Sequence, residues 1–218
     1  MVSGAGADSG VTINLASQSG AAQATGLGND VLLGFENAEG SAYGDTITGD
    51  ETDNEVDGGG GDDTISGGGG EDRLRGGEGN DTIDGGDDFD VLRGEEGDDT
   101  LISRGSGGYG DQMYGGDGAD EFHFLSRDGA DGIVLDFEPD TDQIVIGFRT
   151  DMGSKFTWAG NTGKNYSAWY SENDRGVTLY FDVNGDSHDD NVVAPQPDYS
   201  IAVWGEFNFL QGSDVTFL

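Results

Sequence analysis

Residues 40–102 repeat a nine-residue word seven times without a change of register. The clearest copies read GGGGDDTIS (58–66), GGGGEDRLR (67–75) and GGEGNDTID (76–84). Each opens with glycines, carries Asp at its sixth position and has an aliphatic residue at its eighth. A short fixed period predicts a stacked solenoid, in which each repeat contacts its neighbours, and not a globule around one central core.

Weaker copies of the word extend the register from residue 25 to residue 145. The spacing breaks at 34–39, 103–105, 124–125 and 135–136, where we expect loops or a change in stacking. All eighth positions are apolar and predict one buried ladder: Leu32, Ile47, Val56, Ile65, Leu74, Ile83, Leu92, Leu101, Met113, Phe122, Ile133 and Ile144. The sixth positions are Asp30, Asp45, Asn54, Asp63, Asp72, Asp81, Asp90, Asp99, Asp111, Asp120, Asp131 and Asp142.

The word itself divides into a turn and a strand. Glycines at positions one, two and four tolerate positive φ, which allows a tight turn whose carbonyls point to one centre. The last three residues form a short strand with the middle side chain inward. Two words make one coil, so every second word stacks at about 4.8 Å, the normal strand spacing. The sixth-position carboxylates of stacked words then lie close together and repel unless a cation joins them.

The net charge also indicates bound cations. The 218 residues include 44 acidic and 9 basic side chains, for a net charge of −35, and only 33% are hydrophobic. Such a composition is near that of disordered chains, so a compact fold needs counter-charge. Nucleic acid is itself an anion and is excluded as a partner on this ground. A basic protein or cations remain, and the periodic placement of the acids favours cations. No cysteine is present to form a stabilising disulfide.

Calcium is the predicted cation, because a site of six or more carboxylate and carbonyl oxygens suits calcium better than magnesium or zinc. We expect the carboxylate pairs Asp45/Asp63, Asp63/Asp81, Asp72/Asp90 and Asp81/Asp99, with Asp111 and Asp120 in less regular sites. Asn54 is expected to weaken its own site. The full set of predicted metal ligands is Asp45, Gly59, Gly61, Asp63, Gly68, Gly70, Asp72, Gly77, Gly79, Asp81, Gly86, Asp90, Asp99, Asp111, Gly116, Gly118, Asp120, Asp131 and Asp142.

The word fits the pattern GGxGxDxUx, in which U is a large aliphatic residue, and residues 25–145 therefore resemble the repeats-in-toxin (RTX) family. The resemblance implies an all-β fold: a right-handed parallel β-roll with several Ca²⁺ ions in its turns and a β-rich C-terminal cap. It also implies secretion from a Gram-negative bacterium through the type I machinery, directed by an uncleaved C-terminal signal. The N-terminus shows no signal peptide, and no apolar run reaches the roughly 20 residues of a membrane helix.

The tail resembles the C-terminal domain of serralysin-type metalloproteases, on GVTLYFDVNGD (176–186), DYSIAVWG (198–205) and the terminal DVTFL (214–218). NVVAPQP (191–197) departs from that pattern as an insertion. We expect three segments: a leading strand within 1–24, the calcium-binding roll over 25–145, and a capping and secretion segment over 146–218. The loop 182–190 has the spacing of an EF-hand start but no Glu at position twelve, so a polar hairpin is favoured over a calcium site there.

No catalytic arrangement is predicted. The HExxH motif is absent, and His123 and His188 are far apart in sequence, so the protease activity of the resembled family is not carried over. We expect a monomeric, non-catalytic module of a larger secreted protein that folds on extracellular calcium. One alternative is a polysaccharide-binding module, similar to those of alginate epimerases, that uses Arg149, Lys155, Lys164 and Arg175 or the aromatic residues of 156–170. The other is the end of an adhesin stalk.

Overall fold

The computed structural model describes residues 1–15, 35–104, 110–125, 132–138 and 141–145, and the backbone alone of 22–24, 29–31, 146 and five later strands. Within these residues every regular element is a β-strand. Sheet A has the strand order β1 (Val2–Ser3), β5 (Asn37–Ser41), β7 (Glu55–Gly60), β9 (Arg73–Glu78), β11 (Val91–Glu96), β13 (Gln112–Asp117), β15 (Gly132–Val134), β20 (Tyr199–Trp204), β19 (Gly176–Phe181), β18 (Ser167–Asn173) and β17 (Thr157–Trp158). Sheet B has the order β2 (Thr12–Asn14), β6 (Thr46–Thr48), β8 (Thr64–Gly68), β10 (Thr82–Gly86), β12 (Thr100–Ser103), β14 (Glu121–Phe124), β16 (Gln143–Ile146) and β21 (Val215–Phe217).

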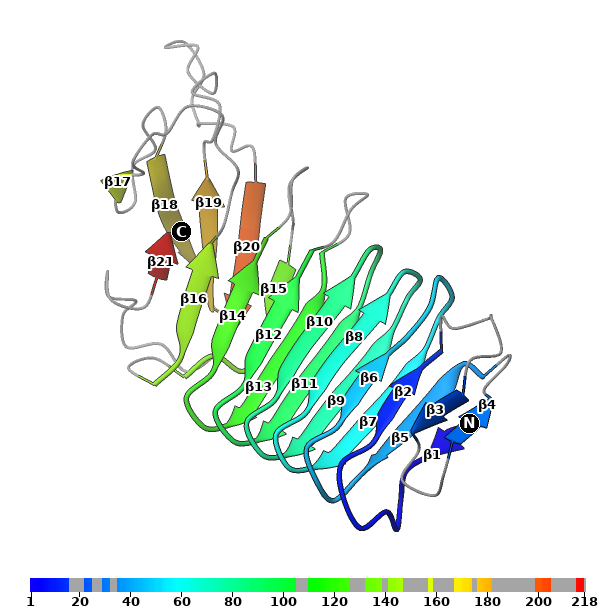
Figure 1. The fold of residues 1–218 in the computed structure, drawn as a ribbon. Helices are drawn as coiled ribbons and strands as arrows, with labels where there is room; N and C mark the ends of the chain where they lie inside the picture. The colour runs from blue at the N-terminus through cyan, green and yellow to red at the C-terminus, as the bar shows by residue number, and fades with distance from the viewer. Residues whose placement is uncertain are drawn as a thin grey trace.

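The repeat words alternate between the two sheets, which gives a parallel β-solenoid of about five turns (Figure 1). In sheet A the register places Val56, Leu74, Leu92 and Met113 side by side. In sheet B it places Ile47, Ile65, Ile83, Leu101, Phe122 and Ile144 side by side. All ten side chains are buried between the sheets, which confirms the predicted fold class and this part of the ladder.

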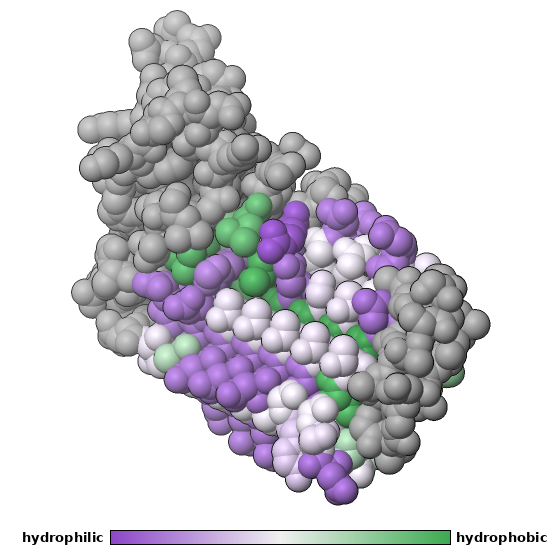
Figure 2. Space-filling model, in the orientation of Figure 1, coloured by the Kyte–Doolittle hydropathy of each residue, from purple (hydrophilic) through white to green (hydrophobic). Residues whose placement is uncertain are grey.

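The core is narrow through the repeats and carries aromatic residues near its C-terminal end. Each coil contributes one apolar side chain from each sheet. Side chains alternate in direction along a strand, so of the seventh, eighth and ninth residues of a word only the eighth points into the core. Phe122, Phe124 and Phe137 are fully buried, and the Phe122 and Phe137 ring centroids are 6.2 Å apart. On the outside, Figure 2 shows hydrophilic and near-neutral residues in rows that cross the coils, with hydrophobic residues visible in patches between the rows.

The first coils are built from other residues than the repeat pattern predicts. The word at 25–33 was expected in the roll, but β4 (Asn29–Val31) instead pairs antiparallel with β3 (Ala22–Ala24) in a separate two-stranded sheet. The strand beneath β7 is β5, with Ala38 opposite Val56, and the strand beneath β6 is β2, with Ile13 opposite Ile47. β1 and β2, which both lie in the predicted leading segment 1–24, thus join sheet A and sheet B of the roll.

The word at 126–134 is displaced by one residue from its predicted register. Val134, and not Ile133, lies opposite Met113 and is buried. The Ile133 N–H donates to the Asp111 carbonyl, just as the Gln112 N–H donates to the Asp90 carbonyl. Gly132 therefore takes the sixth position that was predicted for Asp131, and Asp131 itself lies outside the described residues. The cause is that Ile133 and Val134 are adjacent and both apolar, and the one that fills the core sets the register.

The C-terminal strands continue both sheets. β20 pairs parallel with β15, and β19 pairs antiparallel with both β18 and β20. β21, which contains most of the terminal DVTFL, pairs parallel with β16. The predicted EF-hand-like loop 182–190 and the insertion 191–197 lie outside the described residues. In the part of the chain that is described, no helix has the length and apolar character to span a membrane.

Candidate metal centre

Two files of buried carboxylates run along the solenoid, one beside each turn. The sixth-position residues that the structure describes are buried despite their charge. One file contains Asp45, Asp63, Asp81, Asp99, Asp120 and Asp142, and the other contains Asn54, Asp72, Asp90 and Asp111. The four predicted carboxylate pairs are neighbours within these files.

Each carboxylate is held by the coil before it. The Oδ1 atom of Asp81 accepts a hydrogen bond from the Asp63 N–H at 2.8 Å, and Asp99 and Asp81 are related in the same way at 2.8 Å. The three extra residues near 103–105 do not interrupt this pattern. Across that insertion the Asp90 N–H still donates to Asp111 at 2.9 Å, and the Asp99 N–H donates to Asp120 at 3.0 Å. One oxygen of each carboxylate is therefore fixed by the main chain.

The second oxygen is left without a hydrogen-bond partner in six of these residues, namely the Oδ2 atoms of Asp63, Asp72, Asp81, Asp90, Asp99 and Asp120. A buried carboxylate oxygen without a partner loses its hydration and gains nothing in return, so it is a position that a cation stabilises. Each of these oxygens lies beside the first glycine of its own word, where an added Cβ would clash with it. The first-position glycines were not among the predicted site residues, and their small size is what leaves this space.

Main-chain oxygens border the same space. Beside Gly58 an added Cβ would meet both Asp63 Oδ2 and the carbonyl oxygen of Gly76 in the next coil. An added Cβ on Gly67 would likewise meet Asp72 Oδ2 and the carbonyl oxygen of Gly85. A carboxylate oxygen and a carbonyl oxygen thus lie together beside Gly58, Gly67 and, with Asp99 and Gly115, Gly94, and both are hard donors of the kind that calcium prefers.

The backbone conformation at the second position of the word decides whether the carboxylate oxygen is open. In the six open words this position has positive φ, with values of 102° at Gly59, 119° at Gly77 and 106° at Gly116. The other three are Gly68, Gly86 and Glu95. In this conformation the second-position N–H makes no hydrogen bond to the carboxylate, so Oδ2 stays available.

Three words have a closed turn instead. The N–H groups of Ser41, Asp50 and Glu138, which occupy the second position, donate to the side chains of Asp45, Asn54 and Asp142. None of these three second-position residues has positive φ. Asp45 and Asp142, both predicted ligands, therefore have each carboxylate oxygen occupied by N–H donors, since Asp45 also accepts from Val11 and Asp142 from Asp120. Asn54 leaves its Nδ2 without a partner.

The turn glycines direct their carbonyls along the stack. A Cβ on Gly77 would clash with the Gly59 carbonyl oxygen, and one on Gly79 would clash with that of Gly61. In the same way, a Cβ on Gly86 would clash with the Gly68 carbonyl oxygen, and one on Gly118 would clash with that of Gly97. Gly70 and Gly116 also have positive φ, at 97° and 106°. Gly97, Glu95 and Asp88 hold equivalent turn positions with positive φ, but a pattern of glycines does not reveal Glu95 and Asp88.

Burial raises the pKa of these carboxyls, and the neighbouring carboxylates add to the effect. Desolvation is the main cause for Asp63, Asp72 and Asp99, whose pKa values rise to about 7, and for Asp90, whose pKa rises to about 8. The pKa values of Asp81, Asp120 and Asp142 rise to about 6 for the same reason. The files therefore hold charges that are unfavourable without a cation.

Asp136 is a half-buried acid that the repeat pattern did not reveal. Its two carboxylate oxygens accept hydrogen bonds from the N–H groups of Gly115 and Gly116, at 2.9 and 3.2 Å. It follows the last strand residues of the displaced word, so it has no fixed place in the nine-residue period. Among the described residues no three acidic or histidine side chains converge on one point, so any metal site here combines carboxylates with main-chain carbonyls.

Parallel coils of nine-residue words, with carboxylates and glycine carbonyls at every turn, define a β-roll of the calcium-binding class. Comparison with known protein families matches residues 39–74, 75–105 and 106–124 to the RTX calcium-binding nonapeptide repeat. The repeat block accordingly belongs to the RTX family, and it binds Ca²⁺ ions in several of its turns. No curated protein matches the chain.

Proposed function

We propose that this calcium-binding module folds only when calcium occupies the open turns. The observation that supports the proposal is the set of six buried carboxylate oxygens without hydrogen-bond partners. In each file the carboxylates repeat once per coil, so a cation-free roll confines several repelling charges in a dry turn.

The residues that would hold the ions are those of the open words. These words supply the carboxylates of Asp63, Asp72, Asp81, Asp90, Asp99 and Asp120. Their turns supply carbonyl oxygens of the first-, second- and fourth-position residues, among them Gly59, Gly61, Gly68, Gly76, Gly79 and Gly85. Bound calcium supplies positive charge and a set of short bonds to hard oxygens. This chain's own residues keep the turn open through positive φ and hold one carboxylate oxygen in place through a main-chain N–H.

The energetics allow a switch. At a free calcium concentration about a hundred times the dissociation constant, each occupied site contributes about 2.7 kcal/mol to stability. Several sites together exceed the net stability of most domains, about 5–15 kcal/mol, and therefore decide whether the chain folds. Low calcium inside a cell would keep the chain unfolded, and extracellular calcium would fold it.

Far-ultraviolet circular dichroism in EDTA and in millimolar calcium tests the proposal. We expect a disordered spectrum in EDTA and a β-spectrum in calcium, with a steep dependence on calcium concentration. Asp81→Asn, which removes one ligand of an open turn, should raise the calcium concentration needed for folding by severalfold. Glu51→Gln removes the same charge from an exposed position and should leave it unchanged. A fully folded protein in EDTA at pH 8 or above would disprove calcium-dependent folding.

The wider context is also part of the proposal. RTX proteins are typically secreted by Gram-negative bacteria, and we infer that this chain is the C-terminal part of a larger secreted protein with a type I signal in 146–218. A reporter fused upstream of the chain should reach the medium only when a type I exporter is present and the terminal DVTFL is intact. The alternative polysaccharide-binding role assigned to Arg149, Lys155, Lys164 and Arg175 stays a prediction, because these residues lie outside the described ones.

A further inference from the structure

An open groove of about 300 Å³ crosses the outer face of sheet A, away from the turns. It lies over β7, β9, β11 and the start of β13, and its polar lining consists of Glu55, Asp57, Arg73, Arg75, Arg93 and Gln112. The residues belong to the seventh and ninth positions of the words, whose side chains point outward. On sheet B the seventh positions of β6, β8, β10 and β12 are all threonine, so the groove is a departure from the repeat.

The groove gathers positive charge on a chain that has very little. Four arginines and no lysine lie in the part of the chain whose side chains are described, and three of the four line the groove. The fourth, Arg104, follows β12 of sheet B and is bound by Asp84 at 2.7 Å. A net charge of −35 makes a random clustering of arginines on one face unexpected.

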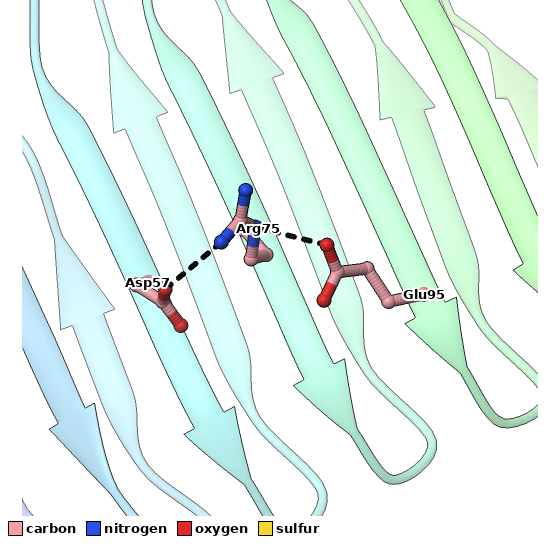
Figure 3. A network of polar contacts seen from close by, with 3 residues as sticks. All are labelled: Asp57, Arg75 and Glu95. Carbon is pink, nitrogen blue, oxygen red and sulfur yellow. Dashed lines mark hydrogen bonds and ion pairs between the residues drawn. The ribbon is translucent and has the colours of Figure 1, made fainter.

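Arg75 is neutralised within the protein. Its guanidinium contacts Asp57 at 3.4 Å and Glu95 at 3.0 Å, from strands on either side (Figure 3). About half of each of these side chains is exposed, so the ion pairs add little stability. They do engage Arg75 with one acid from each neighbouring strand, and this leaves the neighbouring arginines without those acids as partners.

Arg73 and Arg93 are the cations of the groove that have no acidic partner within 4.0 Å. Arg93 lies over the ring of Tyr114, with its guanidinium carbon 4.3 Å from the ring centroid. This contact fixes the side chain and leaves its N–H edge free, because the ring contacts the flat face. Arg73 lies one strand away and two residues back, about 8 Å distant between Cα atoms.

We propose that this groove binds a sugar that carries a carboxylate, of the uronic acid class. Arg73 and Arg93 present planar forks that match carboxylate groups. Glu55 and Asp57 accept hydrogen bonds from hydroxyl groups, and the Gln112 amide both donates and accepts. Half-buried Val91 offers an apolar patch to the C–H face of a sugar ring. Inorganic phosphate has at most two P–OH donors near neutral pH and no C–H face to contact Val91, and a neutral sugar does not use the arginines.

Size and charge limit the ligand further. A volume of about 300 Å³ is at the small end of ligand sites and accommodates one or two sugar rings. A long polyanion would be repelled by the strongly acidic surroundings, whereas one or two carboxylates are compensated locally. The site is independent of the calcium turns, since none of its polar lining residues belongs to the carboxylate files.

Isothermal titration calorimetry on the calcium-loaded chain tests the site, with a galacturonic acid dimer as the ligand and a galactose dimer as the neutral control. We expect saturable binding of the acid and none of the neutral sugar. Arg73→Gln and Arg93→Gln should each weaken binding by about tenfold or more, as expected for lost hydrogen bonds to a charged group. Arg104→Gln makes the same change in charge on the other sheet and should leave the affinity unchanged. Circular dichroism in calcium checks that each variant is folded.

Four outcomes would overturn the proposal. One is the absence of binding to the folded, calcium-loaded protein. Another is an equal loss in Arg104→Gln and Arg93→Gln, which would indicate a response to net charge alone. Equal affinity for the galactose dimer would show that the carboxylate does not contribute to binding. Tighter binding of inorganic phosphate or of a glutamate-rich peptide would assign the groove to a different class of anion. None of these results bears on calcium-dependent folding, which is measured separately.

Discussion

Identical aspartates at the sixth position differ in what their second oxygen contacts. Asp63 and Asp45 both receive a main-chain N–H on Oδ1, but only Asp45 receives one on Oδ2 as well. The difference comes from one neighbouring residue, since Gly59 has positive φ and Ser41 does not. The chemical identity of a ligand residue is therefore insufficient to predict a calcium site, because the conformation of a residue four positions earlier decides whether the oxygen is open.

This distinction predicts how to add a site at the word 49–57. Asn54→Asp alone supplies a carboxylate, but the Asp50 N–H still donates to it, so the number of bound calcium ions should not change. Asp50→Gly combined with Asn54→Asp lets the second position adopt positive φ and should add one ion. Calorimetric stoichiometry and metal analysis after gel filtration measure the difference. An extra ion in the single variant would show that the second-position N–H does not control the site.

Turns and strands within one word obey different constraints. The strand needs only an apolar eighth residue, which Ile, Leu, Val, Met and Phe all satisfy in the described coils. The turn needs positive φ at two positions, and two residues other than glycine adopt it: Asp88 with φ 74° and Glu95 with φ 84°. A non-glycine residue in this region is strained by about 1–2 kcal/mol. Replacing Asp88 or Glu95 with glycine should therefore relieve strain in the turns of 85–93 and 94–102.

Asp88→Gly should stabilise the calcium-loaded protein by about 0.5–1 kcal/mol, because relief of strain outweighs the added freedom of the unfolded chain. The matched control is Asp87→Gly, one residue earlier, where φ is not positive and the substitution should be neutral or slightly destabilising. Both variants remove one exposed acidic side chain, so their effects on net charge are equal. Thermal unfolding at fixed calcium compares them, and equal melting temperatures would contradict the strain argument.

The features that the sequence predicts are those that require a particular residue type at a fixed position of the word. The eighth-position ladder and the sixth-position carboxylates are visible because burial and metal binding require particular residue types at a fixed period. The antiparallel pairing of β3 with β4 was not visible, since the word at 25–33 has the right residues and the choice of partner is made by competing strands. The shift at 126–134 and the capture of Asp136 likewise depend on which of two adjacent apolar residues enters the core. The arginine groove was not predicted either: the alternation of words places 49–57, 67–75 and 85–93 on one sheet, but which outward side chains pair with acids and which stay without an acidic partner depends on contacts that the repeat does not specify.

At the scale of the whole molecule, the charge of −35 is distributed between two environments. Among the acids whose side chains are described, most are exposed or half-buried, where water screens them, and a smaller number lie in the two buried files. Only the buried ones couple folding strongly to the solution, because their environment changes most between the unfolded and the folded chain. Calcium and protons compete for these same oxygens, so the molecule should respond to both.

Protons should replace calcium in part as a stabiliser of the roll. The pKa values of Asp63, Asp72 and Asp99 are about 7 in the folded, calcium-free chain, against 3.8 for an unperturbed carboxyl. The folded state therefore binds more protons than the unfolded state between these values. Its stability is highest below about pH 4 and falls as the pH rises through about 6–8. Each titrating carboxyl changes the free energy of unfolding by at most about 1.4 kcal/mol per pH unit.

In EDTA the chain should thus be more folded at pH 5 than at pH 8, and in calcium the order should reverse, because ligand carboxyls must lose their protons to bind the metal. Circular dichroism at both pH values, with and without calcium, gives the four states needed. The triple variant Asp63→Asn, Asp81→Asn, Asp99→Asn removes three titrating groups from one file and should flatten the response in EDTA. Glu51→Gln, Glu71→Gln and Asp87→Asn together remove three exposed charges and should not. Greater stability at pH 8 than at pH 5 in EDTA would show that the buried files remain ionised without calcium.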